Sequence, residues 1–531
     1  MMTTSAFEIL GPIMVGPSSS HTAGALRIAL VAKSLAPGKI NHATFILHNS
    51  FSATYQGHGT DRALVAGLLG LSTYDTRVKE SFKLAEEQGM GFDFVEAGSD
   101  PGLHPNTVEI KMQCKGGDIT VTGESLGGGR VQLSSIDGVD VEISGEYPTI
   151  FVNHWDRPGV LASLTGILSE SHTNIATMKT YRKAKGAQAY TVIETDEIPS
   201  QGLLEQINHA KNVQSTCLVR VPGAAASPSD TEFTLNFDNG SELLELCYKH
   251  NMSIGEIMHK RECELAADAY NPDEQMVEVL RVMRDEVLAT IVKPEQSLGG
   301  LLFGQAKSIH DTTPFIQDSL MGKSLTKSVS YAMAVLERSA TMGVIVAAPT
   351  AGSAGVVPGA VLGCSEEANS SDSEVINALW CACAIGAIVA RNASVSGAEG
   401  GCQAEVGTAS AMAAAALTQL LGGTPAQCLD AASIAIGNLL GLVCDPVRGL
   451  VEYPCQDRNV IGVADAYSSA QLCLMGIINP IPFDQVVEAM RKVGCALPTS
   501  LRETAQGGLA ATPAAANAGC NSCASCGGFC G

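Results

Sequence analysis

The chain has 531 residues, too many for one ordinary hydrophobic core, so we expect several domains. Its 33 Lys and Arg residues against 54 Asp and Glu residues give a formal net charge of −21. Such a charge repels nucleic acid and anionic membrane surfaces, and a small molecule is the expected partner. The first residues lack the basic and apolar regions of a secretory signal, so the 17 cysteines are expected to be reduced thiols of a cytoplasmic protein.

The first two predicted domains contain strands. Residues 1–146 are predicted to form an α+β domain, because β-branched runs at 42–48, 108–112 and 139–143 alternate with turn residues and short helical stretches. Residues 147–221 follow the order strand, helix, strand, strand, helix, strand, which is a βαββαβ unit. Residues 222–232 are rich in Ala, Ser and Pro and are expected to be a linker.

Residues 233–531 are predicted to form a mostly α-helical domain that ends in a Cys-rich tail at 518–531. The segment is rich in Ala, Gly and Leu, and Ser371 and Glu374 have the spacing of a capping box ahead of an apolar run. That run, 378–390, has 13 residues, fewer than the roughly 18 that suggest a membrane span. We therefore expect a buried core helix there, with the chemistry on the loops between helices.

Three cysteines, Cys402, Cys444 and Cys455, lie in loop-like segments bounded by Gly or Pro, with the spacing C-x41-C-x10-C. Thiolates are the usual ligands of iron–sulfur clusters, and a four-iron cube held by only three cysteines leaves one iron open to bind substrate. Each of the three, taken alone, reads as a buried structural thiol. The loop context of all three favours a metal or cluster site.

Three histidines, His21, His58 and His104, lie in segments rich in Gly, Ser or Pro and are candidate bases. His58 is the first choice because Gly57 and Gly59 let its backbone approach a ligand closely. His21 and His104 are expected to orient the substrate or bind its carboxylate. For each histidine separately, a structural hydrogen-bonded role is the alternative.

Two loops are candidate substrate-binding segments. One carries Ser18, Ser19, Ser20 and Thr22 ahead of an apolar helical run, and helix starts bind anions such as a carboxylate. Its alternative is a plain helix cap, which accounts for one serine but hardly for three. The other loop carries Thr350, Gly352 and Ser353 and can serve the same purpose from the helical region, with a tight glycine turn as its alternative.

Longer strings carry a family resemblance. SGAEGGCQAEVG at 396–407, GLVCDPVRGLVEYPC at 441–455 and APTAGSAGVVP at 348–358 resemble the catalytic alpha region of bacterial iron–sulfur L-serine dehydratases. GPSSSHT at 16–22, GHGTD at 57–61 and HPNT at 104–107 resemble the beta region. The resemblance implies a lyase that converts L-serine to pyruvate and ammonia, with a [4Fe–4S] cluster on Cys402, Cys444 and Cys455 and with Asn106 among the substrate contacts.

The resemblance also bears on the tail. Some members of the family end in a cysteine that caps the open iron until substrate displaces it, whereas this chain ends in Gly531 after Cys520, Cys523, Cys526 and Cys530. Cys520 or Cys530 is then the candidate cap. The tail spacing also matches the ferredoxin pattern C-x2-C-x2-C-x3-C, so a second cluster is an alternative, although a Gly/Ala/Ser tail with exposed thiols is favoured.

The βαββαβ unit resembles the amino-acid-sensing ACT domain through HWDRPGVL at 154–161 and the Asn-Ile pair that follows. This resemblance implies a homodimer and an effector site for serine or for a monovalent cation such as K+. The implied effector residues are Asp156, Pro158, Gly159, Asn174 and Ile175. A purely structural dimerisation module is the alternative.

Two other functions remain as alternatives. A pyridoxal-phosphate dehydratase needs a Schiff-base lysine beside a glycine-rich phosphate cup, but the loop at Gly352 carries no lysine, and Lys323 and Lys327 stand at the start of a predicted helix. A non-enzymatic amino-acid or iron sensor is the second. The sequence has no basic DNA-reading segment, which argues against a transcription-factor form of that sensor.

Overall fold

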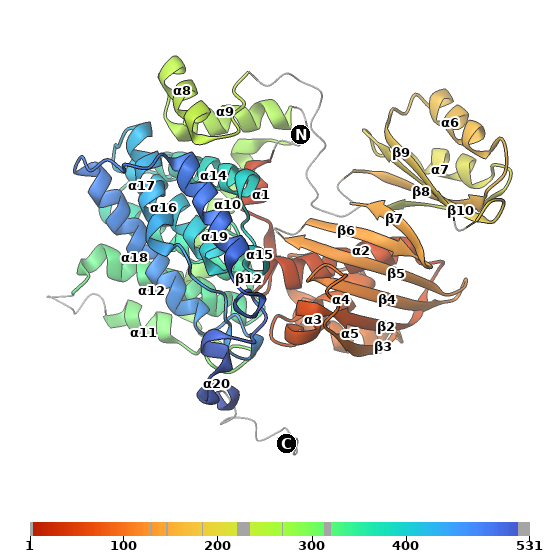
Figure 1. Cartoon of the computed structure of the whole chain (residues 1–531), viewed down its shortest axis with the longest axis horizontal. Helices are drawn as coiled ribbons and strands as arrows, with labels where there is room; N and C mark the ends of the chain where they lie inside the picture. The colour runs from red at the N-terminus through yellow and green to blue at the C-terminus, as the bar shows by residue number, and fades with distance from the viewer. Residues whose placement is uncertain are drawn as a thin grey trace.

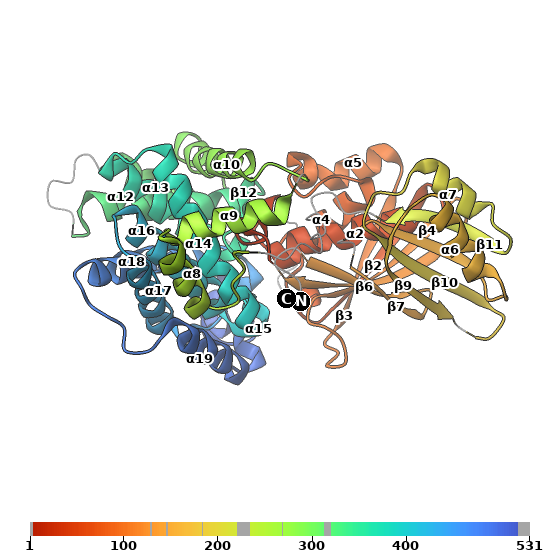
Figure 2. The ribbon, with the colours of Figure 1, turned by 90° about the horizontal axis from the view of Figure 1, so that it is seen from above.

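The computed structural model describes residues 4–127, 130–144, 147–182, 184–219, 234–267, 269–312 and 320–518. The predicted linker at 222–232 and the tail cysteines Cys520, Cys523, Cys526 and Cys530 therefore lie outside the described residues. Within them the chain forms a six-stranded sheet, a four-stranded sheet and a helical body (Figure 1). The helical body and the two sheets lie side by side along the longest axis of the molecule, as Figure 2 shows from above.

The N-terminal domain is built on the six-stranded sheet, with strand order β3-β2-β4-β5-β6-β7. Its strands are β2 (Ile40–His48), β3 (Gly91–Gly98), β4 (Thr107–Cys114), β5 (Ile119–Gly127), β6 (Arg130–Ile136) and β7 (Val139–Ile143), and only the β2–β3 pair is parallel. Its helices are α2 (Ala25–Leu35), α3 (Asn49–Thr54), α4 (Thr60–Leu69) and α5 (Ser81–Gln88). The predicted strands at 42–48, 108–112 and 139–143 are confirmed, because alternate apolar residues such as Ala43, Phe45 and Leu47 are buried in one core with α2 and α4.

The second sheet belongs to a small unit made, in chain order, of β8 (Thr149–Trp155), α6 (Val160–Glu170), β9 (Ile175–Arg182), β10 (Gln188–Thr195), α7 (Gln201–Asn208) and β11 (Val213–Val219). The sheet is antiparallel, with strand order β11-β8-β10-β9. Helices α6 and α7 cover one face. From the other face Phe151, Tyr190 and Val192 join the core of the N-terminal domain, and the Tyr190 hydroxyl donates to Asp137 Oδ2 at 3.1 Å. This face of the sheet is thus buried against the N-terminal domain of the same chain.

The helical body has α14 and α16 at its centre. Its helices are α8 (Gly240–His250), α9 (Ile254–Ala266), α10 (Pro272–Val292), α11 (Gln305–Thr312), α12 (Gly322–Ala340), α13 (Val356–Ala368), α14 (Asp372–Asn392), α15 (Gly397–Gly400), α16 (Thr408–Leu420), α17 (Pro425–Leu439), α18 (Cys455–Leu474), α19 (Phe483–Ala496) and α20 (Pro513–Asn517). The capping box predicted at Ser371 and Glu374 starts α14. By length and composition α14 is the one helix among the described residues that could cross a membrane, but 72% of its apolar window is buried inside the molecule, as predicted for a core helix.

The start of the chain also belongs to the helical body. Helix α1 (Ala6–Ile9) packs against α14, and β1 (Ile13–Val15) pairs antiparallel with β12 (Val344–Val346). Ala6, Ile9 and Met14 are buried in the helical core. The segment that follows β1 therefore enters the N-terminal domain directly at the border between the two bodies, where the candidate site lies.

Candidate active site

A buried cavity lies between the N-terminal domain and the helical body. The N-terminal domain lines it with Pro17, Ser18 and His58. The helical body contributes Gly352, Cys402, Glu405, Cys444, Pro446, Val451, Cys455 and Glu503. The cavity thus unites residues from the serine loop, the His58 loop, the Thr350 loop and all three predicted cysteine segments.

The three cysteines reach the cavity from three different segments. Cys402 follows a turn at Gly401, whose φ of +74° and close neighbours Leu497 and Leu442 favour glycine. Cys444 lies in an extended segment whose N–H donates to Leu501 O at 2.9 Å, and Cys455 is the first residue of α18. The thiols of Cys402 and Cys444 and the Glu405 carboxylate lie within 4.8 Å of one another.

The three thiols are buried, and in such surroundings a thiol ionises when it binds a metal. A hydrogen bond with Cys402, together with burial, raises the pKa of Cys444 well above its usual value, and burial raises the pKa of Cys455 in the same direction. Metal binding deprotonates such thiols. Arg458 is the neighbouring cation, and its guanidinium pairs with Asp445 at 2.6 Å and donates to Val443 O at 2.8 Å. Three convergent thiols beside a partly buried guanidinium fit an anionic iron–sulfur cluster.

The loop with Thr350 touches the cysteine site through Glu405. Thr350 Oγ1 donates to Glu405 Oε1 at 2.7 Å, and a Cβ on Gly352 would lie 3.1 Å from the same oxygen. Burial raises the pKa of Glu405 to about 7. Ser353 lies in the same loop, and its hydroxyl donates to Ala348 O at 3.1 Å, so that it braces the loop.

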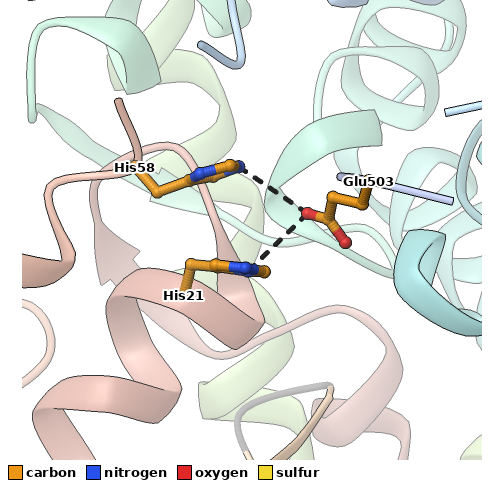
Figure 3. A group of neighbouring side chains, drawn as sticks. All are labelled: His21, His58 and Glu503. Carbon is orange, nitrogen blue, oxygen red and sulfur yellow. Dashed lines mark ion pairs between the residues drawn. The ribbon is translucent and has the colours of Figure 1, made fainter. Parts of the chain in front are cut away.

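His58 lies on the other side of the cavity and packs against His21, and Glu503 lies beside this pair with its carboxyl group directed at both rings (Figure 3). Their rings stack with centroids 4.4 Å apart, and Glu503 Oε1 lies 3.7 Å from both His21 Nδ1 and His58 Nε2. Burial lowers the pKa of His58 to about 4 and that of His21 well below its usual value. Both imidazoles are therefore neutral at neutral pH.

The hydrogen bonds of His58 select its tautomer. Its Nδ1 lies 3.1 Å from Thr54 O, which can only accept, so Nδ1 carries the proton. Its Nε2 then carries a lone pair. This atom is buried and makes no hydrogen bond with any residue that the structure describes. An unprotonated ring nitrogen therefore points into the cavity.

The serine loop holds these histidines in place. Ser18 caps η1 (Ser19–Gly24), accepting from His21 N at 3.0 Å, while Ser20 Oγ lies 2.9 Å from His21 Nδ1. Thr22 Oγ1 donates to His58 O at 2.7 Å. Ser19 is buried in the same turn. The loop is thus a scaffold for the histidine pair, and Ser18 is its member on the cavity wall.

His104 and Asn106 form a separate group of contacts. His104 Nδ1 accepts from Asn106 N at 3.2 Å, and burial lowers the pKa of His104. Asn106 is buried and donates to Ser125 O at 3.4 Å, while its Oδ1 has no partner among the described residues. Neither side chain is among those that line the cavity.

Sequence reasoning missed Glu405, Glu503, Arg458 and Asp445. Glu405 and Asp445 lie inside the strings quoted for the resemblance, three residues after Cys402 and one residue after Cys444 respectively, and that closeness was an available signal. Glu503 belongs to no motif. It adopts a left-handed backbone conformation, with φ of 58°, that costs a non-glycine residue about 1 kcal/mol. Burial raises its carboxyl pKa well above the usual value.

The predicted effector residues gather around the β8–α6 loop and the start of β9. Asp156 accepts from Gly186 N and from Arg182 Nη1, each at 3.0 Å, and Gly159 caps α6 with φ of +92°. Asn174 donates to Asp196 at 2.5 Å. Pro158 lies in the same loop, and Ile175 begins β9.

Three family models match the chain in succession: serine dehydratase beta chain over residues 5–136, ACT domain over 149–210 and serine dehydratase alpha chain over 249–510. An L-serine dehydratase of Mycobacterium tuberculosis is 30% identical over an alignment of 529 positions that covers 96% of this chain and 98% of the relative. One of Helicobacter pylori is 29% identical over 96% of this chain and 99% of its own length. A probable L-serine dehydratase alpha chain of Bacillus subtilis is 45% identical over 280 residues, 52% of this chain and 92% of the relative.

Proposed function

Because this chain belongs to the serine dehydratase family, with beta-chain, ACT and alpha-chain regions joined in one polypeptide, we propose that it converts L-serine to pyruvate and ammonia. The observation that carries the proposal is the shared cavity, where three thiols of the helical body face a neutral histidine of the N-terminal domain. Loss of water from serine needs a base for the Cα proton and an acid for the departing hydroxyl. The two sides of the cavity can supply these two functions.

Cys402, Cys444 and Cys455 would hold a [4Fe–4S] cluster. When bound, the cluster supplies a Lewis acid at its open iron for the substrate hydroxyl and carboxylate. Cys520 or Cys530 remains the proposed cap of that iron. Asp445 and Arg458 connect the Cys444 segment to the first turn of α18, which begins with Cys455, and so fix two of the three ligands relative to each other.

His58 is the proposed base. Thr54 O holds the proton on Nδ1, which leaves Nε2 free to accept the Cα proton of serine. His21 packs against the His58 ring and orients it, and Ser18, Ser19, Ser20 and Thr22 fix both rings. The backbone around Thr350 and Gly352 forms the wall beside Glu405. His104, Asn106 and Ser353 remain proposed substrate-binding residues, although none of the three lines the cavity.

The pyridoxal-phosphate alternative finds no support in the described part of the chain. No described lysine lines the cavity. Lys327 lies in α12, where its Nζ pairs with Glu366 and Glu367. The Gly352 loop packs against the Glu405 carboxyl group, an unsuitable neighbour for a phosphate, since a Cβ on Gly352 would lie 3.1 Å from Glu405 Oε1.

We further propose a homodimer in the cytoplasm that is regulated through the ACT unit, with L-serine or K+ as the effector. The β8–α6 loop offers the Asp156 carboxylate and the tight turn at Gly159 for such a ligand. The sheet face that carries Phe151 and Tyr190 is already packed on the N-terminal domain. Pairing of two ACT units would therefore use the helices or the sheet edges.

Anaerobic reconstitution with iron and sulfide tests the proposal. The purified protein is expected to bind about four irons per chain and to form pyruvate and ammonia from L-serine without pyridoxal phosphate. Single Cys402→Ser, Cys444→Ser and Cys455→Ser variants should lose both the iron and the turnover. The exposed Cys495 serves as the matched control, and Cys495→Ser should keep both. Full iron content in any of the three ligand variants would contradict the assignment.

A further inference from the structure

Glu503 carries a buried carboxyl group, and no described lysine or arginine lies within ion-pair distance of it. It is 6% exposed, and the described groups within ion-pair distance of its carboxyl oxygens are the imidazoles of His21 and His58. The nearby guanidinium of Arg458 is paired with Asp445 instead. A buried carboxyl group of this kind becomes a stable carboxylate only when an opposite charge or several donors accompany it.

Backbone hydrogen bonds on either side of the Glu503 Cα atom hold this residue at the cavity. Its N–H donates to Cys444 O at 2.9 Å, and its carbonyl accepts from Ser50 Oγ at 3.2 Å, the same hydroxyl that contacts His21 Nε2. The Ala398 N–H of α15 donates to its carboxylate. These contacts tie Glu503 to the cysteine segment and to the histidine pair at once, so its position is fixed relative to both halves of the site.

The chemistry of an amino-acid substrate supplies the missing cation. Under the proposed function, the hydroxyl and the carboxylate of serine are held on the cysteine side, and its ammonium group needs a separate anionic partner. The ammonium nitrogen is bonded to the carbon that loses its proton. A carboxylate for the ammonium should therefore lie close to the base, and Glu503 Oε1 lies 3.7 Å from His58 Nε2.

The second carboxylate of the cavity fits this role less well. Glu405 Oε1 already accepts from Thr350, and its carboxylate lies among the thiols of Cys402 and Cys444. The Glu503 carboxyl group is directed at both histidines, as Figure 3 shows. We propose that Glu503 binds the α-ammonium group of the substrate next to His58, an inference that rests on the proposed function and assigns the specificity for amino acids to this residue.

A comparison of two ligands tests the inference. L-Serine carries the ammonium group, whereas 3-hydroxypropanoate is the same molecule without it. In Glu503→Gln, kcat/KM for L-serine should fall about 10- to 100-fold, mainly through KM, because one charge-assisted contact is lost. The inhibition constant of 3-hydroxypropanoate should stay within about threefold of the wild-type value, since that ligand makes no use of the carboxylate.

The control removes a neighbouring charge outside the cavity. Glu399 is an exposed residue of α15 that accepts from Ser394 Oγ at 2.6 Å, and Glu399→Gln should leave both ligands unaffected. Glu503→Asp keeps the charge with a shorter reach, so its loss for L-serine should be smaller than that of Glu503→Gln. Iron content and melting temperature are measured for each variant.

Three results for Glu503→Gln would overturn the inference: unchanged affinity for L-serine, equal weakening of the binding of both ligands, or a loss that affects only kcat. If Glu503→Gln misfolds, the inference is overturned when Glu503→Asp binds both ligands as the wild type does. Failure of the proposed function is seen separately, because the wild type would then form no pyruvate. Anaerobic calorimetry still decides the inference in that case. A wild-type preference for L-serine over 3-hydroxypropanoate that Glu503→Gln abolishes supports it, and equal binding of the two ligands by the wild type refutes it.

Discussion

At the scale of single residues, the carbonyl of Thr54 selects the tautomer of His58. It fixes the proton of His58 on Nδ1, and the buried Nε2 is left as a lone pair with no hydrogen-bond partner among the described residues. Gly57 and Gly59 predicted that His58 approaches a ligand, but the tautomer depends on a contact one helical turn away. The place of Glu503 in the site could not be predicted from the sequence, because its hydrogen-bond partner Ser50 lies 453 positions earlier in the chain.

Removal of the His58 lone pair tests its role as base. His58→Asn should lower kcat for L-serine by about 10²- to 10⁴-fold with the iron content unchanged, because proton abstraction is lost while the cysteine side stays intact. Pyruvate formation and iron analysis measure the two quantities. His42 of β2 is the matched control, as it pairs with Asp93 at the surface. A large loss in His21→Asn combined with near-normal turnover in His58→Asn would move the base to His21.

At the scale of elements, a single ion pair connects two of the segments that carry the ligand cysteines. Asp445 follows Cys444 and is 2% exposed, and Arg458 lies in the first turn of α18, which begins with Cys455. The capping box and the apolar run predicted α14, whereas α18 has no side-chain cap and its start at Cys455 was expected to be a loop. The ion pair could not be predicted, because it joins a loop to a helix whose relative position is set by tertiary packing.

Arg458→Lys tests that connection. Lysine keeps the charge, but its single nitrogen would have to replace two separate guanidinium nitrogens, which contact Asp445 and Val443 O. We therefore expect a loss of about 1–2 kcal/mol in the free energy of unfolding and faster loss of iron to a chelator. Arg458→Met leaves Asp445 buried and unpaired and should cost about 3–5 kcal/mol. Thermal denaturation and chelator kinetics report both effects. Arg491→Lys, in a surface pair with Glu488, is the control and should behave as the wild type. Equal iron retention in all three variants would show that the ion pair has no part in holding the site.

At the scale of the whole molecule, the sequence predicted the kinds of domain but not how they meet. Alternating apolar residues identified the strands, and Ala- and Gly-rich runs identified the helical body. However, β1 has three residues and pairs with β12, which lies more than 300 positions later, so no local pattern could place it in the helical body. The cavity is likewise a product of the interface, because His58 and the cysteines come from opposite sides of it.

This arrangement predicts how a divided chain behaves. If the chain is split between Ala226 and Ser227 and both parts are co-expressed, they should co-purify, because β1 pairs with β12 and α1 packs on α14. The complex should keep turnover of L-serine within about tenfold of the intact chain, since each catalytic group stays on its own part.

The C-terminal part alone carries Cys402, Cys444 and Cys455 but no proposed base. It should therefore form no pyruvate even where it retains iron, and turnover should return when the N-terminal part is added. Pyruvate release by the isolated C-terminal part would place the base within the helical body and remove His58 from the mechanism.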